Sequence, residues 1–390
     1  MNDLCTDIGF MSVNKFGEQL CGDHVEVIDQ SDDSHVVVLA DGLGSGVKAS
    51  ILSTLTSTII STMVANGMSL ESCVDTIAAT LPICEVRKVA YSTFTIVRTI
   101  DNREAEIIQY DNPKLILLRD GKSFDYPQTE TKIDGKTIYK TKIDLHENDF
   151  LVFTSDGAIW AGVGTTMNFG WQREEIVEFL EKMVRPDFTA KTVSSLLLDE
   201  CCRLYGGKPG DDTTVCTVKI RRRRSVNLLF GPPRDPKDVN KMMTLFFAKE
   251  GKHIVSGGTT STLAGEFLGK PVETQLDYLD PDIPPIAKIE GVDLVTEGVI
   301  TMSRVLEYAN GYGEADSIYA DWSVKEDGAS RIARLLLEEA TDVNFFVGTA
   351  VNPAHQNPDL PINFNIKMHL VEELSERLKS LGKRVKVSYF

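Results

Sequence analysis

The sequence lacks the cysteine pattern of a disulfide framework or a structural zinc site. Its cysteine count is seven, which is odd, and no two of these residues form a CxxC pair. They are Cys5, Cys21, Cys73, Cys84, Cys201, Cys202 and Cys216. We therefore expect reduced thiols. All of them precede residue 220, which indicates two segments of different composition.

Long apolar runs are missing as well. No uninterrupted run reaches the ~18 residues that a membrane span needs. The first ten residues carry Asp3 and Asp7 and no basic cluster, unlike a secretory signal. We therefore expect a cytoplasmic protein without a membrane partner.

Positive charge is scarce, because 41 Lys and Arg residues face 57 Asp and Glu residues, for a net charge of −16. This balance argues against a nucleic acid as the main partner. One basic run, Arg221 to Arg224, follows an expected strand, and we interpret it as a solvated boundary. The length of 390 residues is sufficient for two or three domains.

The first 220 residues show short β-rich segments and paired helical patterns, which predict an α+β layout of antiparallel sheets and helix pairs. A hairpin turn is expected at Arg119 to Lys122. Strands are expected at residues 36–40, 91–99, 105–110, 114–118, 149–154 and 213–220, and helices at residues 47–63, 70–81, 174–183 and 192–204.

Beyond residue 224 strand and helix alternate, which predicts βαβ units and a parallel, Rossmann-like sheet. We place the boundary there and expect domains at residues 1–222 and 223–390. Strands are expected at residues 226–230, 253–255, 293–296, 343–347 and 384–388, and helices at residues 235–249, 330–340 and 366–381, with another helix ending at residue 267.

Acidic residues stand at the ends of buried strands in the first segment. Asp41-Gly42 ends one apolar run, Asp156-Gly157 ends another, and Asp211-Asp212 and Gly22-Asp23 each precede a strand. A buried strand holds its terminal carboxylate firmly, and an adjacent glycine lets the backbone approach a cation. Such oxygen-only sites suit Mg²⁺ or Mn²⁺, and two such ions ~3.5–4 Å apart can clamp a phosphate.

Asp-Gly pairs more often simply form turns. The pair occurs five times, at Asp41, Asp120, Asp134, Asp156 and Asp327. We expect a hairpin at Asp120 and polar turns at Asp134 and Asp327. Only the four sites taken together, in their order along the chain, favour metal chemistry.

These motifs resemble those of a known family. Cys21-Gly22-Asp23, LADGLGSGVKAS at residues 39–50, FTSDG at residues 153–157 and GDDTTV at residues 210–215 are similar to the SpoIIE-like bacterial branch of the type 2C metal-dependent protein phosphatases. The resemblance covers residues 1–220. It implies two stacked antiparallel sheets flanked by helix pairs, an αββα sandwich.

The resemblance also implies roles for single residues. Asp41 would bridge two divalent cations, Mn²⁺ or Mg²⁺, with the Gly42 carbonyl on one of them. Asp156 and Asp211 would hold the other cation, and Asp23 would act directly or through water. The implied substrates are phosphoserine or phosphothreonine proteins, often anti-sigma-factor antagonists, attacked by metal-activated water.

Two further residues lie near this set in the sequence. His24 is either a proton donor or an ordinary strand histidine, and the second is commoner. Lys15 is the basic residue nearest to Asp23, where eukaryotic relatives place a phosphate-binding arginine, and its reach is open. We also hypothesise that contacts to the helix after Gly46 regulate the site, because that helix follows Asp41-Gly42 directly.

The C-terminal segment carries one candidate ligand loop, formed by Gly257, Gly258, Thr259, Thr260 and Ser261 between a strand and a helix. Such a turn can hold an anion or a small ligand on backbone amides, or it can be purely structural. Other strand-end loops, at residues 293–298 and 348–357, could line the same crevice. A sensor or docking role is our expectation for residues 223–390.

Three interpretations follow. The first is an active phosphatase. The second is a pseudophosphatase that only binds phosphoproteins. In the third, the C-terminal domain carries the main role, on a small metabolite. The sequence does not determine the target protein, the preferred metal or the oligomeric state.

Overall fold

The computed structural model describes residues 3–31, 33–80, 92–133, 136–164, 166–274, 280–312, 322, 324–350 and 362–390. Cys84, Asp134 and residues 351–357 of one candidate loop therefore lie outside the described residues. The chain divides into two compact units, Met1–Arg222 (unit 1) and Arg223–Phe390 (unit 2).

Unit 1 contains two antiparallel sheets. One has the order β1-β11-β10-β6-β7, and the other has the order β2-β3-β4-β5-β9-β8. The strands are β1 (Leu4–Val13), β2 (Asp23–Ser31), β3 (Ser34–Gly42), β4 (Ser92–Ile100), β5 (Glu104–Tyr110), β6 (Ile116–Arg119), β7 (Lys122–Phe124), β8 (Thr129–Ile133), β9 (Lys136–Asp144), β10 (Phe150–Thr154) and β11 (Thr213–Arg222).

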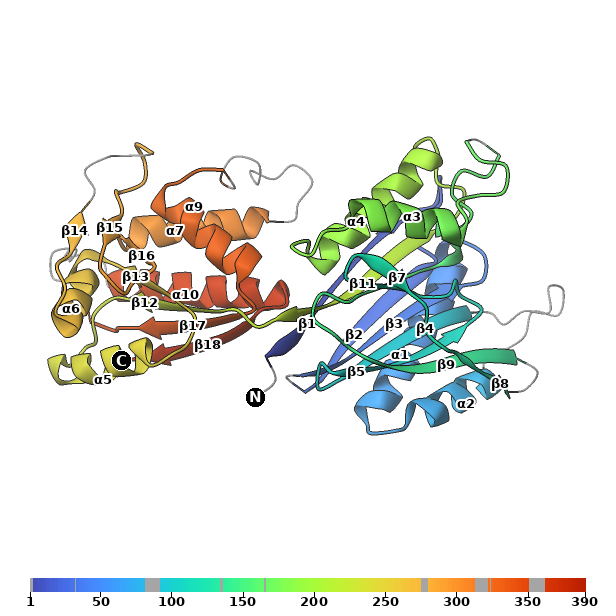
Figure 1. The fold of residues 1–390 in the computed structure, drawn as a ribbon, viewed down its shortest axis with the longest axis horizontal. Helices are drawn as coiled ribbons and strands as arrows, with labels where there is room; N and C mark the ends of the chain where they lie inside the picture. The colour runs from blue at the N-terminus through green and yellow to red at the C-terminus, as the bar shows by residue number, and fades with distance from the viewer. Residues whose placement is uncertain are drawn as a thin grey trace. The chain divides into compact units, whose positions relative to one another are not determined.

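Four α-helices cover the outer faces of these sheets (Figure 1). They are α1 (Gly46–Ala65), α2 (Leu70–Thr80), α3 (Arg173–Met183) and α4 (Ala190–Leu204), and a 3₁₀ turn, η1 (Asp156–Ala158), follows β10. One apolar cluster joins α1 and α2 to β3–β5, a second joins α3 and α4 to β6, β10 and β11, and a third fills the space between the sheets. The expected αββα sandwich is confirmed.

Unit 2 is built on one seven-stranded sheet, with the order β14-β15-β16-β13-β12-β17-β18. Its elements are β12 (Ser225–Phe230), η2 (Pro236–Asp238), α5 (Val239–Phe247), β13 (Lys252–Ser256), α6 (Gly258–Leu268), β14 (Glu273–Thr274), β15 (Ala287–Lys288), β16 (Leu294–Thr296), α7 (Val299–Gly311), α9 (Gly328–Ala333), η3 (Arg334–Glu339), β17 (Asp342–Val347), α10 (Ile362–Ser380) and β18 (Arg384–Tyr389).

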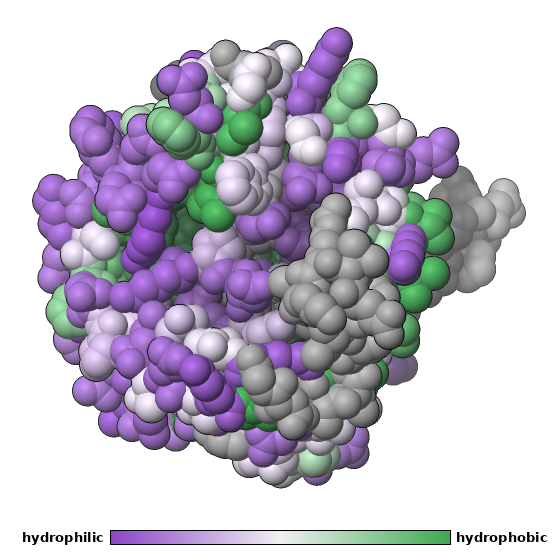
Figure 2. Space-filling model, turned by 90° about the vertical axis from the view of Figure 1, so that its right-hand side faces the viewer, coloured by the Kyte–Doolittle hydropathy of each residue, from purple (hydrophilic) through white to green (hydrophobic). Residues whose placement is uncertain are grey.

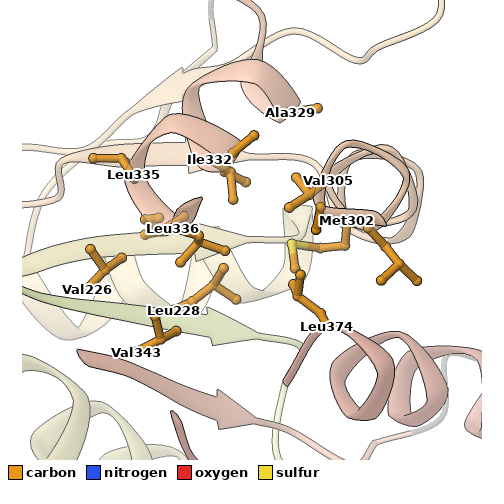
Figure 3. Close-up of a cluster of buried hydrophobic side chains, with 14 of the residues drawn as sticks. Val226, Leu228, Met302, Val305, Ala329, Ile332, Leu335, Leu336, Val343 and Leu374 are labelled. Atoms are coloured by element: carbon orange, nitrogen blue, oxygen red, sulfur yellow. The ribbon is translucent and has the colours of Figure 1, made fainter. Parts of the chain in front are cut away.

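Five strands of this sheet, β16, β13, β12, β17 and β18, run parallel, as expected. The sheet is mixed, however, because β14 and β15 join its edge antiparallel. Helices α7, α9 and α10 share one core with the sheet, and α5 and α6 share another. Figure 3 shows the first core, where Met302 and Val305 of α7 and Leu374 of α10 point toward Leu228 of β12.

Some elements differ from the expectations. The helix expected at residues 235–249 is η2 followed by α5, and the one expected at 330–340 continues from α9 into a π-helix, η3. Strand β1 and helix α7 were not expected. Asp7 and Gly9 interrupt the apolar alternation of β1, and both contact the start of α4. The Asp7 carboxylate accepts a hydrogen bond from the Ala190 N–H at 3.0 Å, and a Cβ on Gly9 would lie 2.2 Å from the Lys191 nitrogen.

Helix α1 is the segment that bears on the expectation about apolar runs. Among the described residues it is the one helix long and apolar enough to cross a membrane by length and composition. The core helix of a globular domain passes the same test, so the signal is weak. Ala49, Ile60 and Val64 of α1 are buried, and Ile60 and Val64 pack into the core with β3 and β4.

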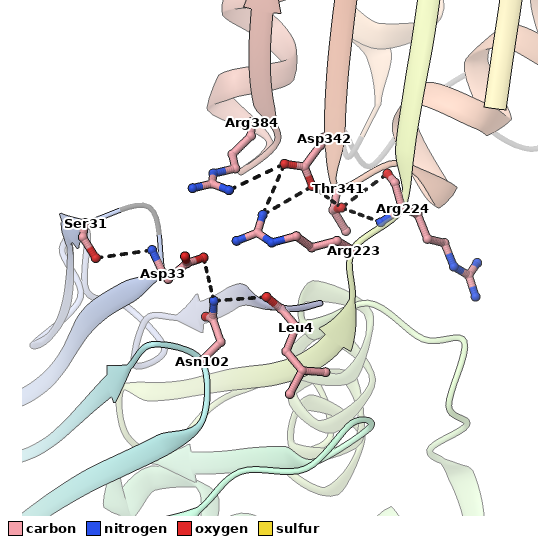
Figure 4. A network of polar contacts seen from close by, with 9 residues as sticks. All are labelled: Leu4, Ser31, Asp33, Asn102, Arg223, Arg224, Thr341, Asp342 and Arg384. Carbon is pink, nitrogen blue, oxygen red and sulfur yellow. Dashed lines mark hydrogen bonds and ion pairs between the residues drawn. The ribbon is translucent and has the colours of Figure 1, made fainter. Parts of the chain in front are cut away.

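Arg222, Arg223 and Arg224 of the basic run have partners within their own unit. In unit 1, Arg222 pairs with Glu147 at 2.7 Å. In unit 2, Arg223 pairs with Asp342 at 3.2 Å, and Arg384 contacts the same carboxylate at 3.7 Å (Figure 4). The Arg224 N–H donates to Thr341 Oγ1 at 2.8 Å. These contacts fit the interpretation of a boundary segment.

Candidate active site

Asp23 and Asp41 are brought together by the pairing of β2 with β3. The two residues stand directly opposite each other in this antiparallel register. Next to them the Gly42 N–H donates to the Gly22 carbonyl at 3.1 Å. A Cβ on Gly42 would lie 2.0 Å from the Ala49 carbonyl oxygen, so only glycine lets α1 pack directly behind the pair.

The end of β10 supplies Asp156 and a serine that the sequence did not point to. Ser155 Oγ donates a hydrogen bond to Asp23 Oδ2 at 2.7 Å and accepts one from the Thr214 N–H at 2.9 Å. Asp156 follows at once and opens η1. Ser155 thus joins three elements, β2, β10 and β11, at one point, and it orients the Asp23 carboxylate.

The loop before β11 contributes both members of the Asp211-Asp212 pair. Asp212 is 4% exposed, and its Oδ1 accepts a hydrogen bond from the Lys15 N–H at 3.0 Å. Asp211 is half-buried, and its Oδ1 lies 3.8 Å from Lys15 Nζ. Asp211 is the residue favoured from the sequence as a ligand, and that role stays a prediction. Lys15 lies beside the acids, and its role toward a phosphate stays a prediction.

The pKa values show that the four predicted acids interact. Burial raises the pKa of Asp41 well above its usual range, and the neighbouring charges of Asp23, Asp156 and Asp211 add to this. Burial raises the pKa of Asp23 to about 7, against hydrogen bonds from Ser155 and Thr214. The pKa values of Asp156 and Asp211 are likewise raised, mainly by burial.

The carboxylate oxygens of this cluster are of the type that binds a divalent cation. The buried atoms Asp23 Oδ1 and Asp212 Oδ2 have no hydrogen-bond partner in the protein. Unpaired buried carboxylate oxygens are costly, and the hard cations Mg²⁺ and Mn²⁺ prefer such oxygen donors. The described side chains do not, however, group three or more acids, histidines or cysteines around a single point. The oxygen donors match divalent cations in chemical type, while their arrangement in this structure does not form a single coordination site.

Other Asp-Gly pairs and His24 have structural roles. Asp120 lies in the expected hairpin, with Arg119 opposite Lys122, and Asp327 caps α9 through the Ser330 N–H at 2.9 Å. His24 is next to Asp23 on β2, so its side chain points to the opposite face. It contacts Glu26 at 3.3 Å, as a strand histidine would.

The candidate loop of unit 2 lies between β13 and α6. Gly257 has a φ of +116°, and α6 begins at Gly258 without a side-chain cap. The Ser261 hydroxyl donates to the Gly257 carbonyl at 2.8 Å, so it is engaged within the helix. The Gly257 N–H donates to the Thr296 carbonyl at 2.9 Å, which ties the loop to the end of β16. A ligand at Gly257, Gly258, Thr259, Thr260 and Ser261 stays a prediction.

Two antiparallel sheets between helix pairs, with acids at converging strand ends, define the PP2C type of protein phosphatase. Residues 31–221 match the family model described as Stage II sporulation protein E (SpoIIE). Unit 1 of this chain is therefore a PP2C-type domain of the SpoIIE family. The match does not extend into unit 2. No curated protein matches the sequence.

Several solved structures are similar to unit 1. The PP2C phosphatase domain of SpoIIE from Bacillus subtilis, with a fragment of its regulatory domain, is 17% identical, with a TM-score of 0.49 over 56% of this chain and 64% of that one. The RsbU and RsbW domains of a Mycobacterium tuberculosis protein are 17% identical, with a TM-score of 0.46 over 56% and 62%. RsbX in complex with magnesium is 19% identical, with a TM-score of 0.41 over 55% and 95%.

The present chain thus spans less than two thirds of the first of these structures. At these identities and TM-scores, the likeness assigns neither a substrate nor a partner to it.

Proposed function

We propose that this chain is a metal-dependent protein serine/threonine phosphatase. The observation that carries the proposal is the acid cluster: Asp41 stands opposite Asp23, and the Asp23 carboxylate accepts a hydrogen bond from Ser155, which directly precedes Asp156. The charges of Asp23, Asp156 and Asp211 add to the rise in the pKa of Asp41. Carboxyl groups that repel one another in a buried site, with oxygens left unpaired, are stabilised by bound cations.

Asp23, Asp41, the Gly42 carbonyl, Asp156 and Asp211 would hold two divalent cations, Mn²⁺ or Mg²⁺. When bound, such ions lower the pKa of water and neutralise a phosphate. The protein's own contribution is positioning. Ser155 orients the Asp23 carboxylate, and the buried strands β3 and β10 hold Asp41 and Asp156 in place.

We further propose that the substrate is a phosphoserine or phosphothreonine of a regulatory protein. The cluster lies at strand ends and between surface loops that carry Lys15 and Trp160, so a phosphate on a partner's surface can approach it. An anti-sigma-factor antagonist is one class of such a substrate. Unit 2 would then serve as a docking or ligand-sensing module, through Gly257–Ser261.

The test uses the full chain with p-nitrophenyl phosphate and a phosphoserine peptide, with Mn²⁺, with Mg²⁺ and with EDTA. We expect hydrolysis that needs the cation and falls on the order of 10³-fold in Asp41→Asn and Asp156→Asn. The matched control is Asp120→Asn, which changes another Asp-Gly pair, in the β6–β7 hairpin, and should keep wild-type rates.

Two outcomes would contradict the proposal. A wild-type chain that hydrolyses neither compound, yet binds the phosphopeptide, would be a phosphoprotein-binding pseudophosphatase. Activity that survives both substitutions would place the chemistry elsewhere, with unit 2 as the next region to test.

A further inference from the structure

Two surface loops beside the acid cluster expose large apolar side chains. Loop 14–20, between β1 and β2, exposes Phe16 by 63% and Leu20 by 46%. Loop 159–171, between η1 and α3, exposes Trp160 by 49%, Val163 by 42% and Phe169 by 81%. No other large hydrophobic side chain in the described part of the chain is as exposed as Phe169. We name these five side chains the apolar rim.

Both loops are bonded directly to residues of the cluster. The Trp160 main-chain N–H donates a hydrogen bond to the Asp156 carbonyl at 3.2 Å, so this loop begins directly on a residue of the cluster. On the other loop, the Lys15 N–H donates to Asp212 Oδ1 at 3.0 Å, and the Phe16 N–H donates to the Pro209 carbonyl at 2.8 Å. The two loops that carry the rim therefore adjoin the candidate active site.

The exposure of Phe169 is held in place by the loop's own structure. Gly170 has a φ of +80°, and a Cβ there would lie 2.2 Å from the Ile159 carbonyl oxygen and 3.2 Å from the Trp160 Cα. The Phe169 carbonyl also accepts a hydrogen bond from Gln172 Nε2 at 2.5 Å. The backbone at Gly170 thus packs against Ile159 and Trp160, and the side chain of the preceding Phe169 is exposed to solvent.

Positive charge lies along the same rim. Lys208 Nζ lies 5.2 Å from the centre of the Phe16 ring, and Lys15 Nζ is within 3.8 Å of Asp211. The view of unit 1 in Figure 2 shows hydrophobic atoms as small separate patches among hydrophilic ones. Aromatic rings next to lysines suit a partner that is both anionic and apolar.

We propose that the apolar rim docks a phosphorylated segment of a protein whose apolar side chains flank the phosphoserine or phosphothreonine. This inference rests on the proposed function and names the kind of substrate that the site prefers. A small phosphate ester would reach the acids but leave Phe169 and Phe16 in water. A peptide with apolar flanks buries these rings, and the two lysines complement its phosphate.

The experiment compares two phosphoserine peptides of nine residues, which carry leucine or alanine at the positions flanking the phosphoserine. With the full chain and Mn²⁺ we expect a KM about 5–10-fold lower for the leucine peptide, at similar kcat. Phe169→Ala should bring the ratio of the two KM values close to one. The control Phe124→Ala removes another exposed phenylalanine of unit 1, one that is 44% exposed on β7, and should leave the ratio unchanged.

Tryptophan fluorescence gives a readout that does not need turnover. Trp171 and Trp322 are 5% and 1% exposed, so acrylamide quenches chiefly Trp160. The leucine peptide should protect Trp160 from quenching at least twofold better than the alanine peptide. This separates the two proposals: a chain that hydrolyses nothing but shows this protection loses the proposed activity and keeps the docking surface.

Three results would overturn the docking proposal. The first is equal KM values and equal protection for the two peptides. The second is protection of Trp160 by rising protein concentration alone, which would make a second copy the occupant. The third is protection by anionic lipid vesicles and not by the peptide.

Discussion

The residues at the ends of the buried strands differ in kind between the two units of this chain. In unit 1 the strand ends carry Asp23, Asp41 and Asp156, whose pKa values are raised, and a buried Asp23 oxygen has no protein partner. In unit 2 the strands β13 and β17 are followed by Gly257 and Gly348, whose main-chain N–H groups donate to the last residue of another strand. The Gly348 N–H, for example, donates to the Phe230 carbonyl at 3.0 Å.

The difference shows where each unit can gain free energy from a ligand. The buried acids of unit 1 repel one another and lower the stability of the fold. A bound cation would offset this repulsion and stabilise the folded state. In unit 2 the main-chain N–H and carbonyl groups of Gly348 already have hydrogen-bond partners. Lys367 Nζ donates to the Gly348 carbonyl at 2.8 Å, and burial lowers the pKa of this amine. Any ligand there must compete with existing bonds or use the uncapped start of α6.

The largest expected effect contrasts one glycine from each unit. A Cβ on Gly157 would lie 2.1 Å from the Asp212 carbonyl oxygen, whereas one on Gly258 meets nothing within 4 Å. We expect Gly157→Ala to destabilise unit 1 by about 3 kcal/mol, or about 10 °C in Tm. Gly258→Ala should change stability by less than about 0.5 kcal/mol. Thermal unfolding checks this, and equal effects of the two substitutions would contradict it.

An intermediate effect is expected from Ser155→Ala. This change removes the hydroxyl that orients Asp23, so we expect Mn²⁺ affinity to fall about 10–100-fold. The control is Ser194→Ala, because Ser194 is also buried in unit 1 but bonds to the Gly9 carbonyl and Thr217. Titration calorimetry with Mn²⁺ measures both variants. Equal losses in both would show that Ser155 acts through stability alone.

The smallest effect is a dependence on pH. The pKa of Asp23 is raised from 3.8 to about 7, so the folded chain binds this proton more tightly than the unfolded chain. The stabilisation is complete below pH 3.8 and is lost as the pH rises through 7. In EDTA we expect the Tm of the wild type to fall by a few degrees relative to Asp23→Asn between about pH 5 and 8.

Mn²⁺ should reverse that trend, because it replaces the proton, and should raise the wild-type Tm more at pH 8 than at pH 6. A difference between wild type and Asp23→Asn that does not vary with pH would show that Asp23 titrates normally.

Much of the acid site could be predicted because each acid is marked by its immediate neighbours. An apolar run, an aspartate and a glycine occur within about eight residues at Asp41 and at Asp156. The sequence could not point to Ser155, because its partner Asp23 is 132 residues away.

The same contrast holds for the fold. Buried strands such as β3 and β10 were predicted because they are continuous apolar runs. The choice between Asp211 and Asp212 could not be checked locally, since the burial of Asp212 depends on Lys15 and on the chain around Gly22. In unit 2 the alternation predicted the parallel strands. The antiparallel edge was missed because β14 and β15 are only two residues long each.

The pairing of Asp23 with Asp41 has a consequence for how the acid site can be lost. In the described sheet β2 is an edge strand, bonded to β3 alone. A slip of one residue would set His24 against Asp41 and turn every β2 side chain to the opposite face. A chain in that state would keep its sheets and helices, but its acids would no longer meet. The register of one edge strand therefore decides whether the folded domain has its acid site.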